Sequence, residues 1–195
     1  MVSKRKRKHF LNKRKREERL KRHKTQCREL AHSEYLASFK DVIYEDYTPQ
    51  NVSGYRWVHN PNVADDFRPQ IFQEATSSSP DDLKAPSPDA PKEVVMEYAS
   101  MFTLSHFVSL EEAVKAWKTN LNRLLKKTKP GKEDRVIERW IEKKGQYVMK
   151  IDYTEESGLV GPGGDGVHKE IFLFEGVDVA SLIDKTFQPY KIEIQ

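Results

Sequence analysis

The sequence of 195 residues contains only one cysteine, Cys27. A single thiol builds neither an internal disulfide nor a zinc site made of several cysteine ligands. We therefore expect the chain to work in a reducing compartment, with Cys27 as a free, unreactive thiol on a helix.

Long apolar runs are missing as well. The longest mostly apolar stretch without a charged side chain spans residues 98–110, far short of the ~20 residues that a membrane-spanning helix needs. No apolar segment follows the first positive charges, and Glu17 and Glu18 are unusual for an organellar transit peptide. We expect no membrane partner and a cytoplasmic location, or a nuclear one if the source is eukaryotic.

Signatures of the familiar enzyme classes are absent too. The sequence has no H-E-x-x-H, no Walker lysine loop and no G-x-S-x-G, and no two of its six histidines are four residues apart. Ser105 and His106 resemble a nucleophile beside its base, but neighbouring residues on a strand point to opposite faces. We expect no cofactor and no metal. Catalytic activity is left open, with the balance against it.

Glycine is scarce, yet Gly161, Gly163 and Gly166 satisfy the dinucleotide-binding pattern G-x-G-x-x-G. That pattern binds a pyrophosphate when its last glycine opens a helix, whereas residues 167–175 have the composition of a strand. We interpret the glycines as a hairpin loop in which glycine supplies positive φ.

What the sequence has in excess is positive charge at its start. Residues 1–24 contain 13 of the 34 Lys and Arg but only two of the 30 Asp and Glu, a net charge of +11. Residues 25–195 carry 21 basic and 28 acidic residues, a net charge of −7. This asymmetry indicates a polyanionic partner for the tail and a protein partner for the acidic body.

The tail is predicted to bind RNA or DNA without sequence preference, because each cation that meets a phosphate releases a condensed counterion. A nuclear localisation signal and a merely solvated or membrane-attracted tail are the alternatives. Only Phe10, Leu11 and Leu20 could insert into lipid, which disfavours the membrane. The predicted nucleic-acid-binding residues are Lys4, Arg5, Lys6, Arg7, Lys8, Lys13, Arg14, Lys15, Arg16, Arg19, Lys21, Arg22 and Lys24.

Apolar residues recur at helical spacing from Cys27 to Phe39, which predicts a helix. We expect it to end near Lys40, because Val42–Tyr44 is β-prone, and a short strand to follow at 55–58. Four segments are predicted along the chain: a basic tail (1–26), a helix and irregular segment (27–75), a flexible Pro/Ser-rich linker (76–92) and an α+β domain (93–195).

Residues 93–195 carry the clearest signals of secondary structure. A strand is expected within 94–104, and Ser109 followed by Glu112 predicts a capping box that opens a helix. A second helix after the Pro130-Gly131 break completes a helical hairpin, with Trp117 and Trp140 facing inward. Strands at 146–153, 169–174 and 190–194 and a short helix at 177–185 follow.

The predicted fold class is α+β. A basic N-terminal extension and a helix precede a small, mostly antiparallel sheet, and the helical hairpin covers that sheet.

Four polar side chains near the 158–168 loop form a candidate pocket. His168 follows the glycines, and acidic residues lie at the ends of the strand after it. An ordinary polar residue at a strand entry is the alternative interpretation of His168. The candidate pocket residues are His168, Glu170, Glu175 and Asp178.

Residues 65–185 resemble the running pattern of short uncharacterised bacterial α+β proteins, a resemblance that implies a bacterial or phage origin more than a function. It is carried by residues 66–70, 104–107, 109–113, 144–148, 166–168 and 174–178. The layout of hairpin, strand and small sheet is also similar to fragments of ADP-ribosyltransferase-like domains. The Arg, Ser-Thr-Ser and Glu triad of that activity is not found here, so no catalytic residue is carried over.

Three functions are compatible with these observations. The first is a non-enzymatic, nucleic-acid-associated accessory protein, whose tail contacts phosphates while its acidic body docks on a protein. The second is a small enzyme or toxin-like effector that uses the candidate pocket. The third is a structural component of a ribonucleoprotein or phage particle.

Overall fold

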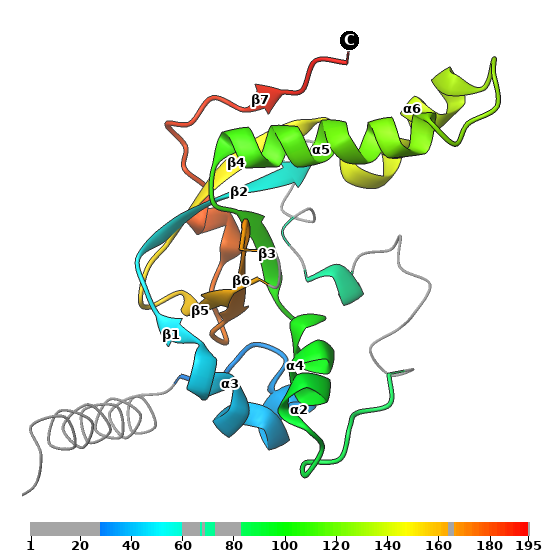
Figure 1. The fold of residues 1–195 in the computed structure, drawn as a ribbon. Coiled ribbons are helices and arrows are strands. Elements are labelled where there is room, and N and C mark those ends of the chain that lie inside the picture. The colour runs from blue at the N-terminus through cyan, green and yellow to red at the C-terminus, as the bar shows by residue number, and fades with distance from the viewer. Residues whose placement is uncertain (1–27, 60–66, 68, 73–82, 164–165, 195) are drawn as a thin grey trace, which may run out of the picture.

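The computed structural model describes residues 28–59, 67, 69–72, 83–163 and 166–194. They contain a seven-stranded sheet in the order β1-β5-β6-β3-β2-β4-β7, in which every neighbouring pair is antiparallel (Figure 1). The predicted α+β class is confirmed. The strands are β1 (Thr48–Pro49), β2 (Val52–Val58), β3 (Leu104–Phe107), β4 (Tyr147–Tyr153), β5 (Gly158–Pro162), β6 (His168–Leu173) and β7 (Tyr190–Lys191).

Helices lie at two ends of this sheet. The described helices are α2 (Ser33–Leu36), α3 (Lys40–Asp46), α4 (Lys92–Ser100), α5 (Leu110–Leu125) and α6 (Glu133–Lys144). The described 3-10 turns are η1 (Ala37–Phe39), η3 (Gln70–Phe72) and η5 (Val179–Leu182).

Strand β4 has both faces covered. The strand predicted at 146–153 is confirmed, with Met149 and Ile151 buried on one face and Val148 buried on the other. Strand β2 pairs with β4 along its whole length, and the predicted edge strand is β7, on the other side of β4. Since β2 comes from the 27–75 segment and β4 from the 93–195 segment, the two segments share one sheet.

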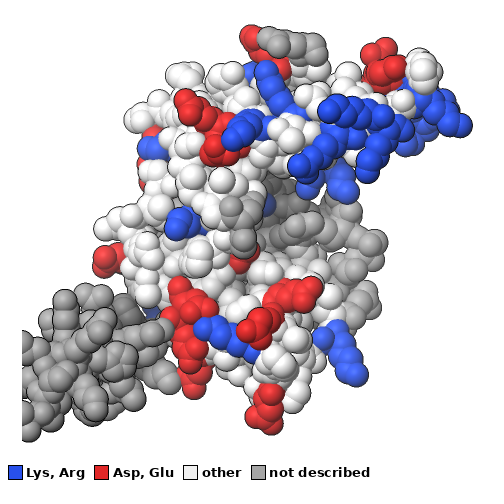
Figure 2. All heavy atoms as spheres, viewed as in Figure 1, with Lys and Arg blue, Asp and Glu red and all other residues white. Residues whose placement is uncertain are grey.

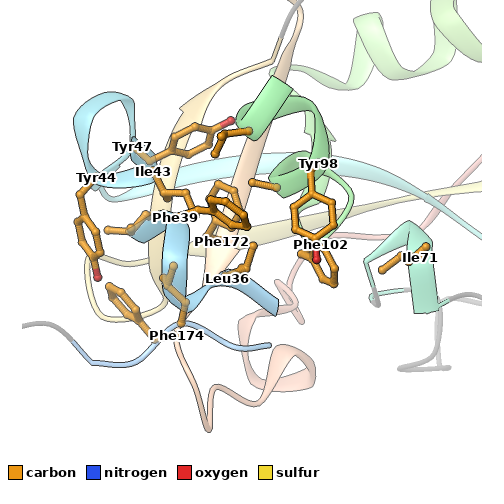
Figure 3. Packing of buried hydrophobic residues seen from close by; sticks show 14 residues of the cluster. Leu36, Phe39, Ile43, Tyr44, Tyr47, Ile71, Tyr98, Phe102, Phe172 and Phe174 are labelled. Atoms are coloured by element: carbon orange, nitrogen blue, oxygen red, sulfur yellow. The ribbon is translucent and has the colours of Figure 1, made fainter. Parts of the chain in front are cut away.

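Helices α2, α3 and α4 cover the β5–β6 end of the sheet (Figures 1 and 3). Leu36 and Phe39 are buried in this cluster. The helix predicted from Cys27 starts later than expected: α2 begins at Ser33, because Leu30 pairs with Phe174 in an isolated β-bridge, and Cys27 itself lies outside the described residues. The prediction that the helix ends near Lys40 is wrong, because α3 continues to Asp46. Ile43 lies four residues after Phe39 and is fully buried in the same cluster, so burial overrides the β propensity of 42–44.

The prediction of a strand within 94–104 is also wrong. Residues Lys92–Ser100 form α4, and only Leu104 of that range belongs to a strand, β3. Val95, Tyr98 and Ala99 recur at helical spacing and are buried against α3 and η1. The apolar residues that suggest a strand therefore form the buried stripe of a helix.

Part of the predicted linker, residues 83–91, is described. Leu83 and Ala90 are partly buried and pack against the cluster formed by α2–α4. Lys92, assigned to the linker, is the first residue of α4.

The helical hairpin is confirmed. Ser109 Oγ accepts a hydrogen bond from the Glu112 backbone N at 3.1 Å, which is the N-cap of α5. Trp117 is fully buried, donates from Nε1 to the Gly145 carbonyl at 2.9 Å, and has its ring centroid 6.0 Å from that of Trp140. These contacts hold α5 and α6 on the face of β2 and β4.

The glycine-rich stretch is a strand in its first part. Residues Gly158–Pro162 form β5, so the prediction of a loop beginning at residue 158 is wrong. A Cβ on Gly161 would overlap the ring of Tyr47, and one on Gly158 would overlap the backbone of Phe172. These two glycines therefore allow close approach, and Gly166 is the one among the described glycines of this stretch with positive φ. Strand β6, rather than a helix, follows it, which supports the interpretation against dinucleotide binding.

Candidate nucleic-acid interface

All thirteen predicted nucleic-acid-binding residues of the tail, from Lys4 to Lys24, lie outside the described residues. Their role stays a prediction. The described residues contain a second basic region that the sequence analysis did not single out. Residues 115–132 hold seven Lys and Arg and no Asp or Glu. They lie on the second half of α5 and on its connection to α6.

The spacing of α5 separates its apolar and basic residues. Ala113, Trp117 and Leu121 recur every four residues and are buried against the sheet. Lys118, and Lys126 at the C-cap, lie away from that stripe on the helical wheel, because successive residues turn by about 100°. The same amphipathic pattern that docks the helix therefore directs its cations outward.

A basic stripe continues along α6. Arg135, Arg139 and Lys143 are spaced four residues apart and share one exposed face of the helix. We define the hairpin surface as ten of the eleven cations of the two helices and their connection, leaving out Lys144; nine of the ten are exposed and Lys118 is half-buried. They are Lys115, Lys118, Arg123, Lys126, Lys127, Lys129, Lys132, Arg135, Arg139 and Lys143.

These cations are mostly not neutralised by acids of the chain. Among the residues that the structure describes, Lys115 is the one member of the hairpin surface in an ion pair, 3.4 Å from Glu112. Figure 2 shows Lys and Arg gathered over the α5–α6 hairpin. The neighbouring Lys144 is half-buried, and burial, followed by the charges of Lys143 and Arg56, lowers its pKa. The hairpin surface thus offers unpaired positive charge to solvent.

The opposite end of the sheet is acidic. Helices α2, α3 and α4 carry six exposed acids but only two lysines. Lys92 lies 2.7 Å from Asp46 and 3.1 Å from Glu45, and the hydrogen bond to Asp46 is the main cause of its raised pKa. Lys40 lies 3.7 Å from Glu29. Both lysines of these helices are therefore paired with acids, and the described body has a positive and a negative end (Figure 2).

The candidate pocket residues do not gather into one cluster. His168 and Glu170 share a face at the start of β6, whereas Glu175 and Asp178 follow its far end. Glu170 accepts a hydrogen bond from Tyr47 Oη at 2.7 Å, and burial, followed by this bond, raises the pKa of Tyr47. A catalytic role for these four residues stays a prediction.

Each of the pocket residues also has a local structural role. The His168 ring lies 4.1 Å from that of Phe107, between centroids. The Glu175 backbone N donates to the Glu29 carbonyl at 2.7 Å. Asp178 accepts from the Ala180 backbone N at 3.0 Å and so caps η5, which is shorter than the helix expected at 177–185.

A buried polar pair lies in the sheet. His106 is fully buried, its ring 5.2 Å from that of Tyr153 between centroids. Neither imidazole nitrogen nor the Tyr153 hydroxyl has a hydrogen-bond partner in the described structure. Ser105 is exposed on the opposite face, so the prediction that Ser105 and His106 form no dyad is confirmed. Only the position of His106 on an apolar strand could have signalled its burial.

Two further findings concern other kinds of site. Within the described ranges, no three His, Cys, Asp or Glu side chains are grouped so that they could hold a metal ion. None of the described helices combines the length and the apolarity needed to cross a membrane. Comparison with family models, with curated proteins and with solved structures finds no match for this chain.

Proposed function

We propose that this protein is a nucleic-acid-associated accessory protein that binds phosphates through the hairpin surface and the basic tail. The observation that carries the proposal is the stretch 115–132, where seven cations and no acid lie on the second half of α5 and on its connection to α6, six of the cations being exposed. Such a surface favours binding of a polyanion. Cations without acidic partners displace the counterions condensed on the nucleic acid, and no ion pair within the protein has to be broken first.

The charge distribution also predicts how the nucleic acid is oriented. Without residues 115–132, the body from residue 25 onward carries 14 basic and 28 acidic residues. Repulsion keeps phosphates away from the acidic α2–α4 end, so a nucleic acid approaches the hairpin side. The acidic end then stays available for a protein partner, which completes the proposed accessory role. The compartment would be the cytoplasm, or the nucleus in a eukaryotic source.

The test is fluorescence anisotropy of the full chain with labelled nucleic acid across a salt series. The hairpin variant is K126Q/K127Q/K129Q, in which glutamine removes charge and keeps a similar helix propensity. The matched control is K84Q/K185Q/K191Q, three exposed lysines outside the hairpin. A third variant has every Lys and Arg of residues 4–16 replaced by Gln.

Each phosphate contact adds about 0.9 to the slope of log affinity against log salt for B-form DNA. The hairpin variant is expected to reduce the slope by roughly 2 to 3, and the control by less than about 1. The tail variant should reduce it as well. Equal slopes for the hairpin variant and the control would refute the hairpin surface, and absence of salt-dependent binding in the unmodified protein would refute the function.

A further inference from the structure

The end of the hairpin protrudes beyond the core that holds it. The buried residues of α5 end at Leu121, and α6 has none. We define the hairpin tip as residues 122–132, of which all are exposed except the half-buried Leu125 and Thr128. Figure 1 shows α5 and α6 extending away from the sheet at this end. The tip, made of the last turn of α5 and the connection to α6, therefore projects into solvent.

The tip offers charge but no platform for base stacking. It carries Arg123, Lys126, Lys127, Lys129 and Lys132, and no acid. Residues 110–144 are all described, and their aromatic side chains are not exposed, since Trp117 is buried and Trp140 half-buried. Surfaces that bind single strands combine cations with exposed aromatic rings. A basic tip without such rings suits the regularly spaced phosphates of a duplex.

The dimensions favour B-form DNA over double-stranded RNA. An α-helix with its side chains is about 10–12 Å wide, which matches the B-DNA major groove of about 12 Å. The major groove of A-form RNA is too deep and narrow for such an element. Asn122 is exposed one turn before Lys126, on the outward side of α5, and an Asn amide is suited to the edge of adenine.

Resting on the proposed function, we infer that the hairpin tip binds double-stranded DNA. The outward side of α5 at Asn122, with the C-cap residue Lys126, enters the major groove, and Lys127, Lys129 and Lys132 of the connection bind the flanking phosphates. Most of the interaction is with the backbone, so sequence preference is weak.

The test is a competition experiment with the full chain and a labelled duplex of about 20 base pairs, roughly two helical turns. Unlabelled duplex DNA, single-stranded DNA and duplex RNA of the same sequence compete at equal nucleotide concentration. Duplex DNA is expected to compete roughly tenfold better than either. This preference should disappear in K126Q/K127Q/K129Q and persist in K84Q/K185Q/K191Q. Equal competition, a preference for either other nucleic acid, or a preference unchanged in the hairpin variant would overturn the inference.

A second variant separates groove contact from charge. N122A is expected to weaken duplex binding without changing the salt slope, because asparagine carries no charge. Unchanged affinity would overturn the placement in the groove. Far-ultraviolet circular dichroism confirms that each variant is folded. Binding to all three nucleic acids alike would refute only the inference, whereas binding to none would refute the proposed function itself.

Discussion

Replacing His106 with phenylalanine should remove a large part of the acid sensitivity of the fold. His106 is fully buried in β3, and neither ring nitrogen has a hydrogen-bond partner in the described structure. Burial, and after it the positive charge of Arg56, lowers the pKa of His106 from 6.5 to about 4. The imidazole is therefore neutral in the folded protein at neutral pH, and charging it in place is costly.

The sign of the effect follows from the two protonation equilibria. Between pH 6.5 and about 4 the unfolded chain binds a proton at His106 and the folded protein does not. The stability that depends on a neutral His106 is therefore present in full above pH 6.5 and is lost as the pH falls toward 4. A difference of about 2.5 in pKa corresponds to a loss of about 3 kcal/mol in the free energy of unfolding.

The assay is urea unfolding of the unmodified protein and of H106F at about pH 7 and about pH 4. Other groups contribute equally to both proteins, so the unmodified protein should lose about 3 kcal/mol more than H106F. H106L provides a second non-titrating side chain of different shape. An equal loss in all three proteins would refute the argument that His106 is held neutral by burial.

Three further predictions concern stability. G54A places a Cβ into the imidazole of His106 and should cost about 1–3 kcal/mol in urea unfolding, a cost that should largely vanish in an H106A background. S109A removes the N-cap of α5 and should lower the free energy of unfolding by about 1 kcal/mol, whereas S109D should retain most of the stabilisation because aspartate also caps helices. W117A removes a fully buried indole that donates to Gly145 and should cost about 3–5 kcal/mol, far more than the exposed T119A.

The elements that could be predicted from the sequence are those with local signals. Ser109 and Glu112 mark the start of α5, and the spacing of Trp117 and Leu121 defines its buried stripe. The alternation of β4 is likewise visible in the sequence alone. In each case the pattern that directs burial lies within one element.

The elements that could not be predicted depend on contacts distant in sequence. Ile43 is helical because α3 packs with Phe172 of β6, more than a hundred residues later. Residue 161 in strand β5 is a glycine because the ring of Tyr47 occupies the place where a side chain would be. β propensity and glycine content are local quantities, so they indicate neither of these partners.

The hairpin surface is hard to predict from the sequence for a different reason. A net charge of −7 over residues 25–195 averages a basic hairpin with an acidic remainder. The run from Lys115 to Lys132 without an acid is visible in the sequence, but its meaning depends on α5 being docked through Trp117 and on the connection after it being exposed at Lys126. Charge counted along the helical wheel of α5 would have found it.

The most direct measurement of the central claim is lysine acetylation of the full chain, with and without duplex DNA, followed by mass spectrometry. We expect DNA to protect Lys126, Lys127, Lys129 and Lys132 and to leave the exposed Lys84 and Lys185 as reactive as before. Protection of tail lysines alone, with the hairpin lysines as reactive as Lys84, would contradict it.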